Sequence, residues 1–508
     1  MKTDFSPIRR RWSVVLISSV LPLLLLALYF SVKHVSGPYF YSANIDPDYP
    51  YFFNGLNINT GRAPFHIDHP GTPVQLLLAG IIGVCSPGEK TWSIIASSEQ
   101  YLHLANCMLF AFILGSFALA GWLIYRKTQR AWPVILFQGS IAFLGANLYC
   151  LSRANPEPAM LGVALLLGVL VYLDISRASE KTAWSFVFIA ALLCATGAAC
   201  KLTFISLVLL PLLLIRGGSR KGVYLVLFFL FFTLWLWPDY GSADRFFQWI
   251  KSLASHTGRY GSGAVGLIEP HAYLANLLWL LAQNFTFAVL LAASIVVPLW
   301  QWRSTQRLAP AARALLFIAF SETLQIAMVC KYRENRYLLP ALGLAGLNAL
   351  LLEQMLQGSR WCRWCQFFWT ILILAGAGQG GCELHRLHRS SLESAAILQE
   401  METAHAVDVK IYGYAASSQA YALYFGNEFS GGLYDRELKQ LNRDSDRTFF
   451  YDFGGFYHGA SGPVPLQKIL KLSGSKVFQS APFLDGPRGV KLRERFGGDQ
   501  EKIYEIVP

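Results

Sequence analysis

Residues 45–75 read IDPDYPYFFNGLNINTGRAPFHIDHPGTPVQ and directly follow the first long apolar segment of the chain. Their first part is denser in ionisable side chains than any other stretch of the N-terminal half; these are Asp46, Asp48, Arg62, His66, Asp68 and His69. Asp46 and Asp48 flank a proline that fixes the local backbone, and they precede an aromatic run at residues 49–53. Carboxylates placed in this way can serve as a general base beside rings that exclude water or stack on a sugar.

The composition indicates a membrane protein with many spans. Of 508 residues, 54% are hydrophobic and 15% are charged, whereas ordinary soluble proteins carry about 25% charged residues. Residues 1–381 hold 28 Lys and Arg against 15 Asp and Glu, and residues 382–508 hold 15 against 16. The net charge of +12 therefore reports membrane topology and not a nucleic-acid partner. None of the nine cysteines follows Cys382, which argues against a disulfide scaffold.

Runs of about 20 mainly apolar residues predict about eleven transmembrane helices. Their limits are 12–34, 101–125, 132–150, 158–175, 183–200, 202–215, 222–238, 273–300, 312–330, 337–356 and 364–381. The boundaries within 183–215 stay open, because residues 197–201 can form a break between two half-spans. The predicted fold class is a polytopic α-helical membrane protein with a small C-terminal α/β domain.

Basic residues predict the orientation of these spans. If the N-terminus is cytoplasmic, every inside connection carries Lys or Arg, as the positive-inside rule requires. The first loop (35–100), the loop 239–272 and the tail (382–508) then lie outside the plasma (inner) membrane. Strand-like pieces at 409–415 and 448–454, with a helical piece at 416–426, make the tail an extracytoplasmic α/β domain beside the transmembrane domain 1–381.

The first loop resembles that of the GT-C superfamily of membrane glycosyltransferases, in particular the protein O-mannosyltransferases and the aminoarabinose transferases of lipid A. The likeness rests on an Asp after the first span, on Gly61 fifteen residues later, and on His69-Pro70-Gly71 opening a short apolar run. It places Asp46 where the family carries its catalytic acidic residue, with Asp48 as second candidate. The family has Asp-Glu where this chain has Asp46-Pro47-Asp48, and HPP where it has His69-Pro70-Gly71, so the choice between the two aspartates stays open.

The resemblance implies an inverting transfer of a hexosyl or pentosyl group from a polyprenyl-phosphate donor to a hydroxyl or amine of a glycolipid, glycan or protein at the outer membrane face. The lipid phosphate then needs cationic partners. The candidates are Lys201, Lys331, Arg333 and Arg336, the last three within CKYRENRYLLP, which is similar to the RYxLP element of the family. No cofactor is certain, although a divalent metal remains possible.

Further candidates for substrate contact have ordinary alternatives. His66, Asp68 and His69 are either surface groups or metal ligands. Arg153 and Glu157 either bind substrate or form an ion pair with each other, and Glu322 faces a cavity or bonds a neighbouring helix. Rival functions are a transporter or lipid flippase, a polysaccharide ligase or polymerase with pyrophosphate-linked donors, and a receptor whose tail binds a ligand.

Overall fold

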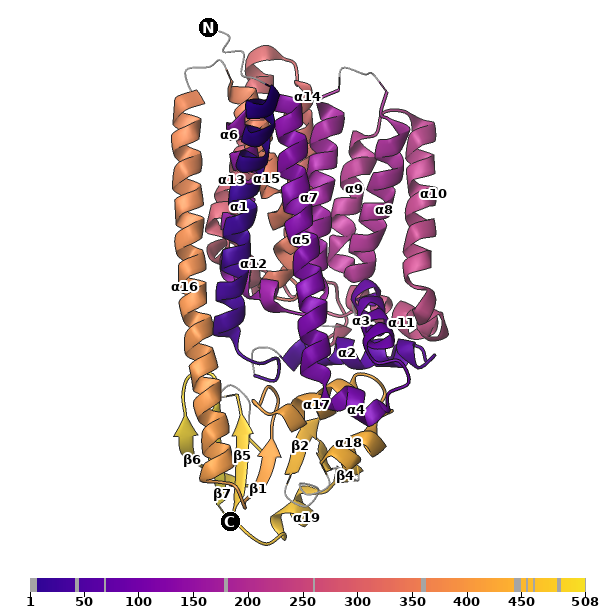
Figure 1. Ribbon diagram of the computed structural model, residues 1–508, viewed down its shortest axis with the longest axis vertical. Coiled ribbons are helices and arrows are strands. Elements are labelled where there is room, and N and C mark those ends of the chain that lie inside the picture. The colour runs from indigo at the N-terminus through magenta and orange to yellow at the C-terminus, as the bar shows by residue number, and fades with distance from the viewer. Residues whose placement is uncertain are drawn as a thin grey trace.

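The computed structural model describes residues 7–41, 45–67, 70–177, 181–258, 261–357, 362–442, 449–453, 456–459, 462–481 and 486–507. A long helix bundle forms one part of the molecule, and a small sheet domain lies beyond one end of the bundle (Figure 1). Helix α16 (Cys362–Thr403) runs along the side of the bundle and continues into the sheet domain. The sequence-based division at 381/382 falls inside this helix.

Apolar helices build the bundle. They are α1 (Pro7–Ser36), α5 (Ser98–Thr128), α6 (Ala131–Gln138), α7 (Pro156–Ile175), α8 (Trp184–Cys200), α9 (Ile205–Leu214), α10 (Gly218–Trp235), α12 (Pro270–Gln283), α13 (Phe285–Thr305), α14 (Pro310–Val329) and α15 (Leu339–Leu356), with α16 at the edge. Within the described part of the chain, nine helical stretches are long and apolar enough to cross a membrane. Two more expected spans correspond to α8 and α9, which are shorter apolar helices. The predicted fold class is confirmed, whereas the number eleven is not.

Two spans differ from the simple helices that the apolar pattern predicts. Helix α6 continues as the 3₁₀ helix η1 (Gly139–Ser152), in which Gly145 leaves helical geometry at φ 42° and ψ −115°. The expected span 273–300 divides at Asn284, whose side-chain amide donates to the Leu280 carbonyl at 2.9 Å and so terminates α12. Hydropathy does not reveal this break, because the two polar residues Gln283 and Asn284 stand between long apolar runs.

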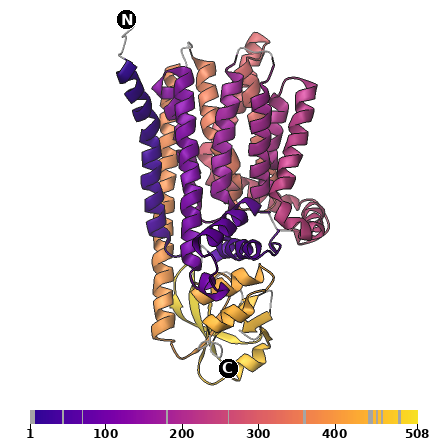
Figure 2. The ribbon, with the colours of Figure 1, turned by 45° about the vertical axis from the view of Figure 1, so that its right-hand side comes forward.

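Short helices gather at the end of the bundle that faces the sheet domain (Figure 2). They are α2 (Ile45–Asn59), α3 (Thr72–Cys85), α4 (Thr91–Ala96) and α11 (Ala243–Ser255), with the 3₁₀ turns η2 (Leu202–Phe204), η3 (Trp237–Ser242) and η5 (Asn335–Leu338). The loops that the sequence places on one membrane face therefore lie together at this end. Its assignment to the outer face remains a prediction from the basic connections.

A seven-stranded mixed sheet forms the C-terminal domain, in the order β4-β3-β2-β1-β5-β7-β6. The strands are β1 (Val409–Tyr412), β2 (Phe449–Phe453), β3 (Phe456–Gly459), β4 (Gly462–Val464), β5 (Lys476–Ser480), β6 (Lys491–Gly497) and β7 (Lys502–Val507); the helices are α17 (Gln419–Glu428), α18 (Asp435–Leu441) and α19 (Leu466–Leu470). The central strand β1 is parallel to both β2 and β5, and the other pairs are antiparallel. This confirms the small α/β domain expected from the tail.

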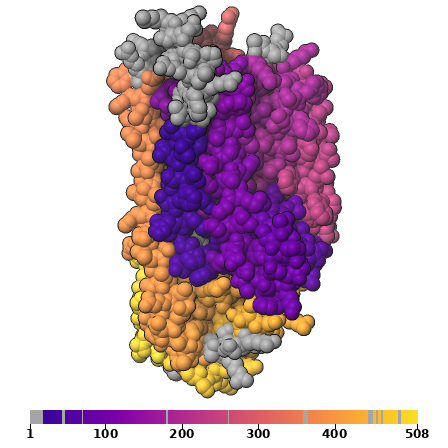
Figure 3. Space-filling view, in the orientation of Figure 1, coloured from indigo at the N-terminus to yellow at the C-terminus, as the bar shows by residue number. Residues whose placement is uncertain are grey.

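The sheet domain docks on α2. Asn54 and Asn57 of α2 donate through their side-chain amides to the carbonyls of Phe429 and Ser430, each at 3.1 Å. A Cβ atom at Gly426 of α17 would lie 2.7 Å from the Phe53 ring, so only glycine allows the two helices to approach this closely. Figure 3 shows the indigo and purple N-terminal segments resting directly on the orange and yellow domain.

Candidate functional site

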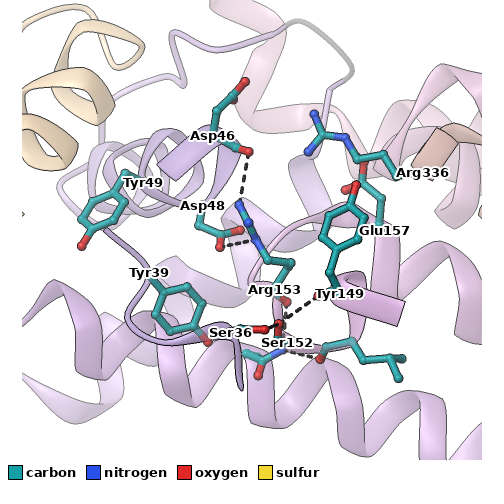
Figure 4. A network of polar contacts seen from close by, with 12 residues as sticks. Ser36, Tyr39, Asp46, Asp48, Tyr49, Tyr149, Ser152, Arg153, Glu157 and Arg336 are labelled. Carbon is teal, nitrogen blue, oxygen red and sulfur yellow. Dashed lines mark hydrogen bonds and ion pairs between the residues drawn. The ribbon is translucent and has the colours of Figure 1, made fainter. Parts of the chain in front are cut away.

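The first turn of α2 presents two aspartates in different environments. Asp48 is fully buried, and its Oδ2 lies 2.8 Å from Nε of the buried Arg153. Nη2 of the same arginine donates to the backbone carbonyl of Asp46 at 3.2 Å, while the Asp46 side chain stays half-exposed (Figure 4). Burial raises the pKa of Asp48 to about 6, although Arg153 opposes this shift. Arg153 therefore fixes the turn and leaves the Asp46 carboxylate accessible.

The C-terminal domain reaches the Asp46 side chain. The Tyr414 hydroxyl, which follows β1, donates to Oδ2 of Asp46 at 3.2 Å. Although Tyr414 is 43% exposed, desolvation and the Asp46 charge raise the pKa of its phenol, and the Arg336 guanidinium acts in the opposite direction. The phenol therefore remains a neutral donor within electrostatic reach of both Asp46 and Arg336.

A second ionic cluster surrounds Glu157 in the first turn of α7. Oε1 of this fully buried carboxylate lies 2.6 Å from Nζ of Lys201 and 3.6 Å from Nε of Arg336. The Lys201 ammonium also lies 4.0 Å from the centroid of the Tyr337 ring. Arg336 is partly exposed and has a second carboxylate, Glu334, at 3.5 Å. Two cations, Lys201 and Arg336, therefore share the Glu157 carboxylate.

Asp46 and Arg336 point to the same side of the polar network, with Asp48 and Arg153 behind Asp46 (Figure 4). This arrangement unites an accessible carboxylate from α2 with a partly exposed guanidinium from η5. A carboxylate can accept a proton, and a guanidinium can bind a phosphate through two parallel hydrogen bonds. The site therefore contains a proton acceptor and a phosphate-binding cation, the two groups needed to transfer a group from a phosphate leaving group.

Two of the expected phosphate-binding cations make other contacts. Nζ of Lys331 donates to the carbonyl of Leu253 near the end of α11. The Arg333 guanidinium lies 5.1 Å from the ring centroid of Trp279 in α12. Both side chains thus contact the elements at the two ends of the expected loop 239–272.

The remaining expected contacts take ordinary structural partners. Glu322 in α14 is fully buried, and both its oxygens accept from the Asn348 amide of α15, at 2.8 and 2.9 Å. The suggested ion pair of Arg153 with Glu157 is replaced by the Asp48–Arg153 and Lys201–Glu157 pairs. These partners come from separate helices, so residue spacing did not reveal them.

His66 packs among aromatic rings. Its ring meets those of Tyr51 and Phe429 edge-on, with centroids 5.7 and 5.4 Å apart. Asp68 and His69 lie outside the described residues. Among the residues that the structure does describe, no three His, Cys, Asp or Glu side chains form a group that could hold a metal ion.

Sequence reasoning missed Tyr414, Glu334 and Tyr337. Tyr414 was detectable in principle, because it follows a central parallel strand, and ligand-binding groups in such sheets gather at the carboxyl ends of the strands. Glu334 and Tyr337 belong to the same short segment as Arg336 and were overlooked because only its cations were weighed.

Comparisons with known proteins support the fold. No family model matches the chain, and no curated protein matches it in sequence. The crystal structure of ArnT from Cupriavidus metallidurans in the apo state aligns with a TM-score of 0.52 and 11% identity, covering 96% of this chain and 97% of that chain. The same enzyme bound to undecaprenyl phosphate aligns over the same shares with a TM-score of 0.49 and 12% identity. The alignment with the apo enzyme shows that the chain shares the overall fold of ArnT, as the resemblance of its first loop implied.

Proposed function

We propose that this protein is a membrane glycosyltransferase that moves a sugar from a polyprenyl-phosphate donor to a hydroxyl or amine of an acceptor. The observation that carries the proposal is the half-exposed Asp46 carboxylate directed to the same side as Arg336. Beneath them, buried ion pairs fix both groups. The fold shared with ArnT supports the same class of reaction.

Asp46 is the better candidate for the general base. A base must come within hydrogen-bond reach of the proton that it removes. Asp48 is fully buried against Arg153, so an acceptor cannot reach it without breaking a buried ion pair, whereas Asp46 is half-exposed.

The proposed reaction is a single displacement. Asp46 takes the proton of the acceptor hydroxyl or amine as the acceptor atom forms a bond with the anomeric carbon of the sugar. The bond from this carbon to the phosphate oxygen breaks, and the polyprenyl phosphate leaves with the electron pair. Arg336 binds the developing negative charge, and Lys201 adds positive charge behind it. Attack opposite the leaving group inverts the anomeric configuration.

The location of the site matches a lipid-linked donor. The basic connections favour a cytoplasmic N-terminus, and with this orientation the site and the domain 382–508 lie on the outer face of the plasma membrane. The donor phosphate then lies at the bilayer surface, while its polyprenyl chain stays in the membrane next to domain 1–381.

The test uses the purified protein in lipid nanodiscs with synthetic polyprenyl-phosphate sugars and an extract of cell-envelope glycolipids, glycans and proteins. We expect free polyprenyl phosphate to appear together with an acceptor whose mass has increased by one sugar residue. Movement of an unchanged donor across sealed vesicles would instead identify a flippase. Exclusive use of pyrophosphate-linked donors would identify a ligase or polymerase.

A further inference from the structure

We propose that Tyr414 is a positioning residue for Asp46, so that the C-terminal domain completes the transfer site. The inference rests on the proposed function, because it assigns a role to the hydroxyl that holds the proposed base. Tyr414 lies 368 positions after Asp46 in the sequence, yet its hydroxyl donates to Oδ2 of that aspartate at 3.2 Å.

The contacts of Asp46 divide between two parts of the molecule. Arg153 holds the main chain of the residue through the Asp46 carbonyl, and Tyr414 holds its carboxylate. The Tyr414 ring in turn lies edge-on to that of Phe425 in α17, with centroids 5.8 Å apart. Because both the main chain and the carboxylate of Asp46 are held, its short side chain has few accessible rotamers. A general base needs this fixed orientation toward the proton that it removes.

Backbone strain marks the turn that carries Tyr414. The next residue, Ala415, has φ 62°, and this left-handed conformation is unfavourable for a residue with a Cβ atom. Among the described residues only three other non-glycine residues have a positive φ. Gln129 and Gln306 cap helix ends, and Arg333 lies two residues after Lys331. Strain of this kind persists where the surroundings enforce it, typically at functional sites.

A buried carboxylate enforces the strained turn. Glu501 is fully buried and accepts from the backbone N–H of Ser417 at 2.9 Å and from Nε2 of Gln479 at 2.7 Å. The N–H of Gly413 donates to the carbonyl of Gln479 at 2.8 Å. The turn is thus fixed on both sides of Tyr414, although the hydroxyl itself bonds a residue outside the domain.

The position of Tyr414 also follows from how the domain docks. The amides of Asn54 and Asn57 hold the domain against α2, the helix whose first turn carries Asp46. Any motion that separates the domain from α2 therefore also removes the hydroxyl from the carboxylate. Transfer should then require a docked domain.

The test compares Tyr414→Phe with a matched control, Tyr451→Phe. The Tyr451 hydroxyl also donates to a carboxylate, that of Glu428 at 2.7 Å, but both partners belong to the C-terminal domain. In Tyr414→Phe we expect kcat to fall by roughly tenfold, the size of the loss of one hydrogen bond to a charged group. KM for the lipid donor and the thermal unfolding temperature should stay at the wild-type values, and Tyr451→Phe should keep the wild-type kcat.

A Tyr414→Ala variant separates the hydroxyl from the ring. If the hydroxyl positions Asp46, the Phe and Ala variants lose similar amounts of kcat. Wild-type kcat in Tyr414→Phe, a lowered unfolding temperature in that variant, or an equal loss in Tyr451→Phe would each overturn the inference. Failure of the proposed function is distinct, because the wild-type protein would then transfer no sugar at all.

Discussion

Replacing Asp48 by asparagine should destabilise the protein strongly, because it leaves the Arg153 charge buried. Asp48 and Arg153 are at most 1% exposed, and Nε and Oδ2 lie 2.8 Å apart. Breaking a buried ion pair by removing one partner costs about 3–5 kcal/mol. Asp46→Asn, at a half-exposed position whose side chain accepts a hydrogen bond from Tyr414, should cost less than about 1.5 kcal/mol.

The assay is thermal unfolding of both variants and of Asp48→Asn/Arg153→Gln in the same detergent. We expect Asp48→Asn to unfold at the lowest temperature, and the double variant to regain part of the loss, since no unpaired charge remains buried. If Asp48→Asn unfolds like the wild type but transfers no sugar, Asp48 acts as the base and the assignment of roles is wrong.

Three further predictions concern other groups. Arg336→Lys should lower kcat/KM for the lipid donor about tenfold, because an ammonium cannot bind phosphate through two parallel hydrogen bonds. Steady-state rates at varied donor concentration would measure this change. An unchanged kcat/KM would show that Arg336 does not bind the phosphate. Burial raises the pKa of Asp239 from 3.8 to about 6, and the hydrogen bond from Thr72 opposes this shift. The stabilising contribution of Asp239 is therefore present below pH 3.8 and is lost as the pH rises through 6. Unfolding temperatures measured from pH 4.5 to 7.5 should therefore depend less on pH in Asp239→Asn, and an unchanged dependence would refute this. Glu322→Gln, which retains a partner for Asn348, should keep the transfer rate within about twofold of wild type, whereas complete loss of transfer would give Glu322 a direct role.

Much of the fold was predictable because it depends on local composition. Apolar runs of membrane length located the nine long helical stretches found among the described residues, and the two shorter helices α8 and α9. Alternating and aromatic-rich segments located β1, β2 and α17 in the tail. The first-loop motif also indicated the fold that the comparison with ArnT shows.

The geometry of the candidate site was not predictable, because distant segments meet there. Asp48 and Arg153 are 105 positions apart, and Glu157 and Lys201 are 44 apart. The spacing to Gly61 favoured Asp46 over Asp48 but left the choice open, and the burial of Asp48 in the structure now supports Asp46. The contact from Tyr414 depends on how the whole C-terminal domain packs on α2, which no local pattern records.

The most direct test of the central claim is sugar transfer by Asp46→Asn from a polyprenyl-phosphate donor, followed by mass spectrometry of donor and acceptor. We predict that the purified variant folds with a near wild-type unfolding temperature, binds the donor, and forms no glycosylated acceptor and no free polyprenyl phosphate above background. Wild-type transfer by Asp46→Asn would contradict the role of Asp46 as the base and with it the proposed mechanism.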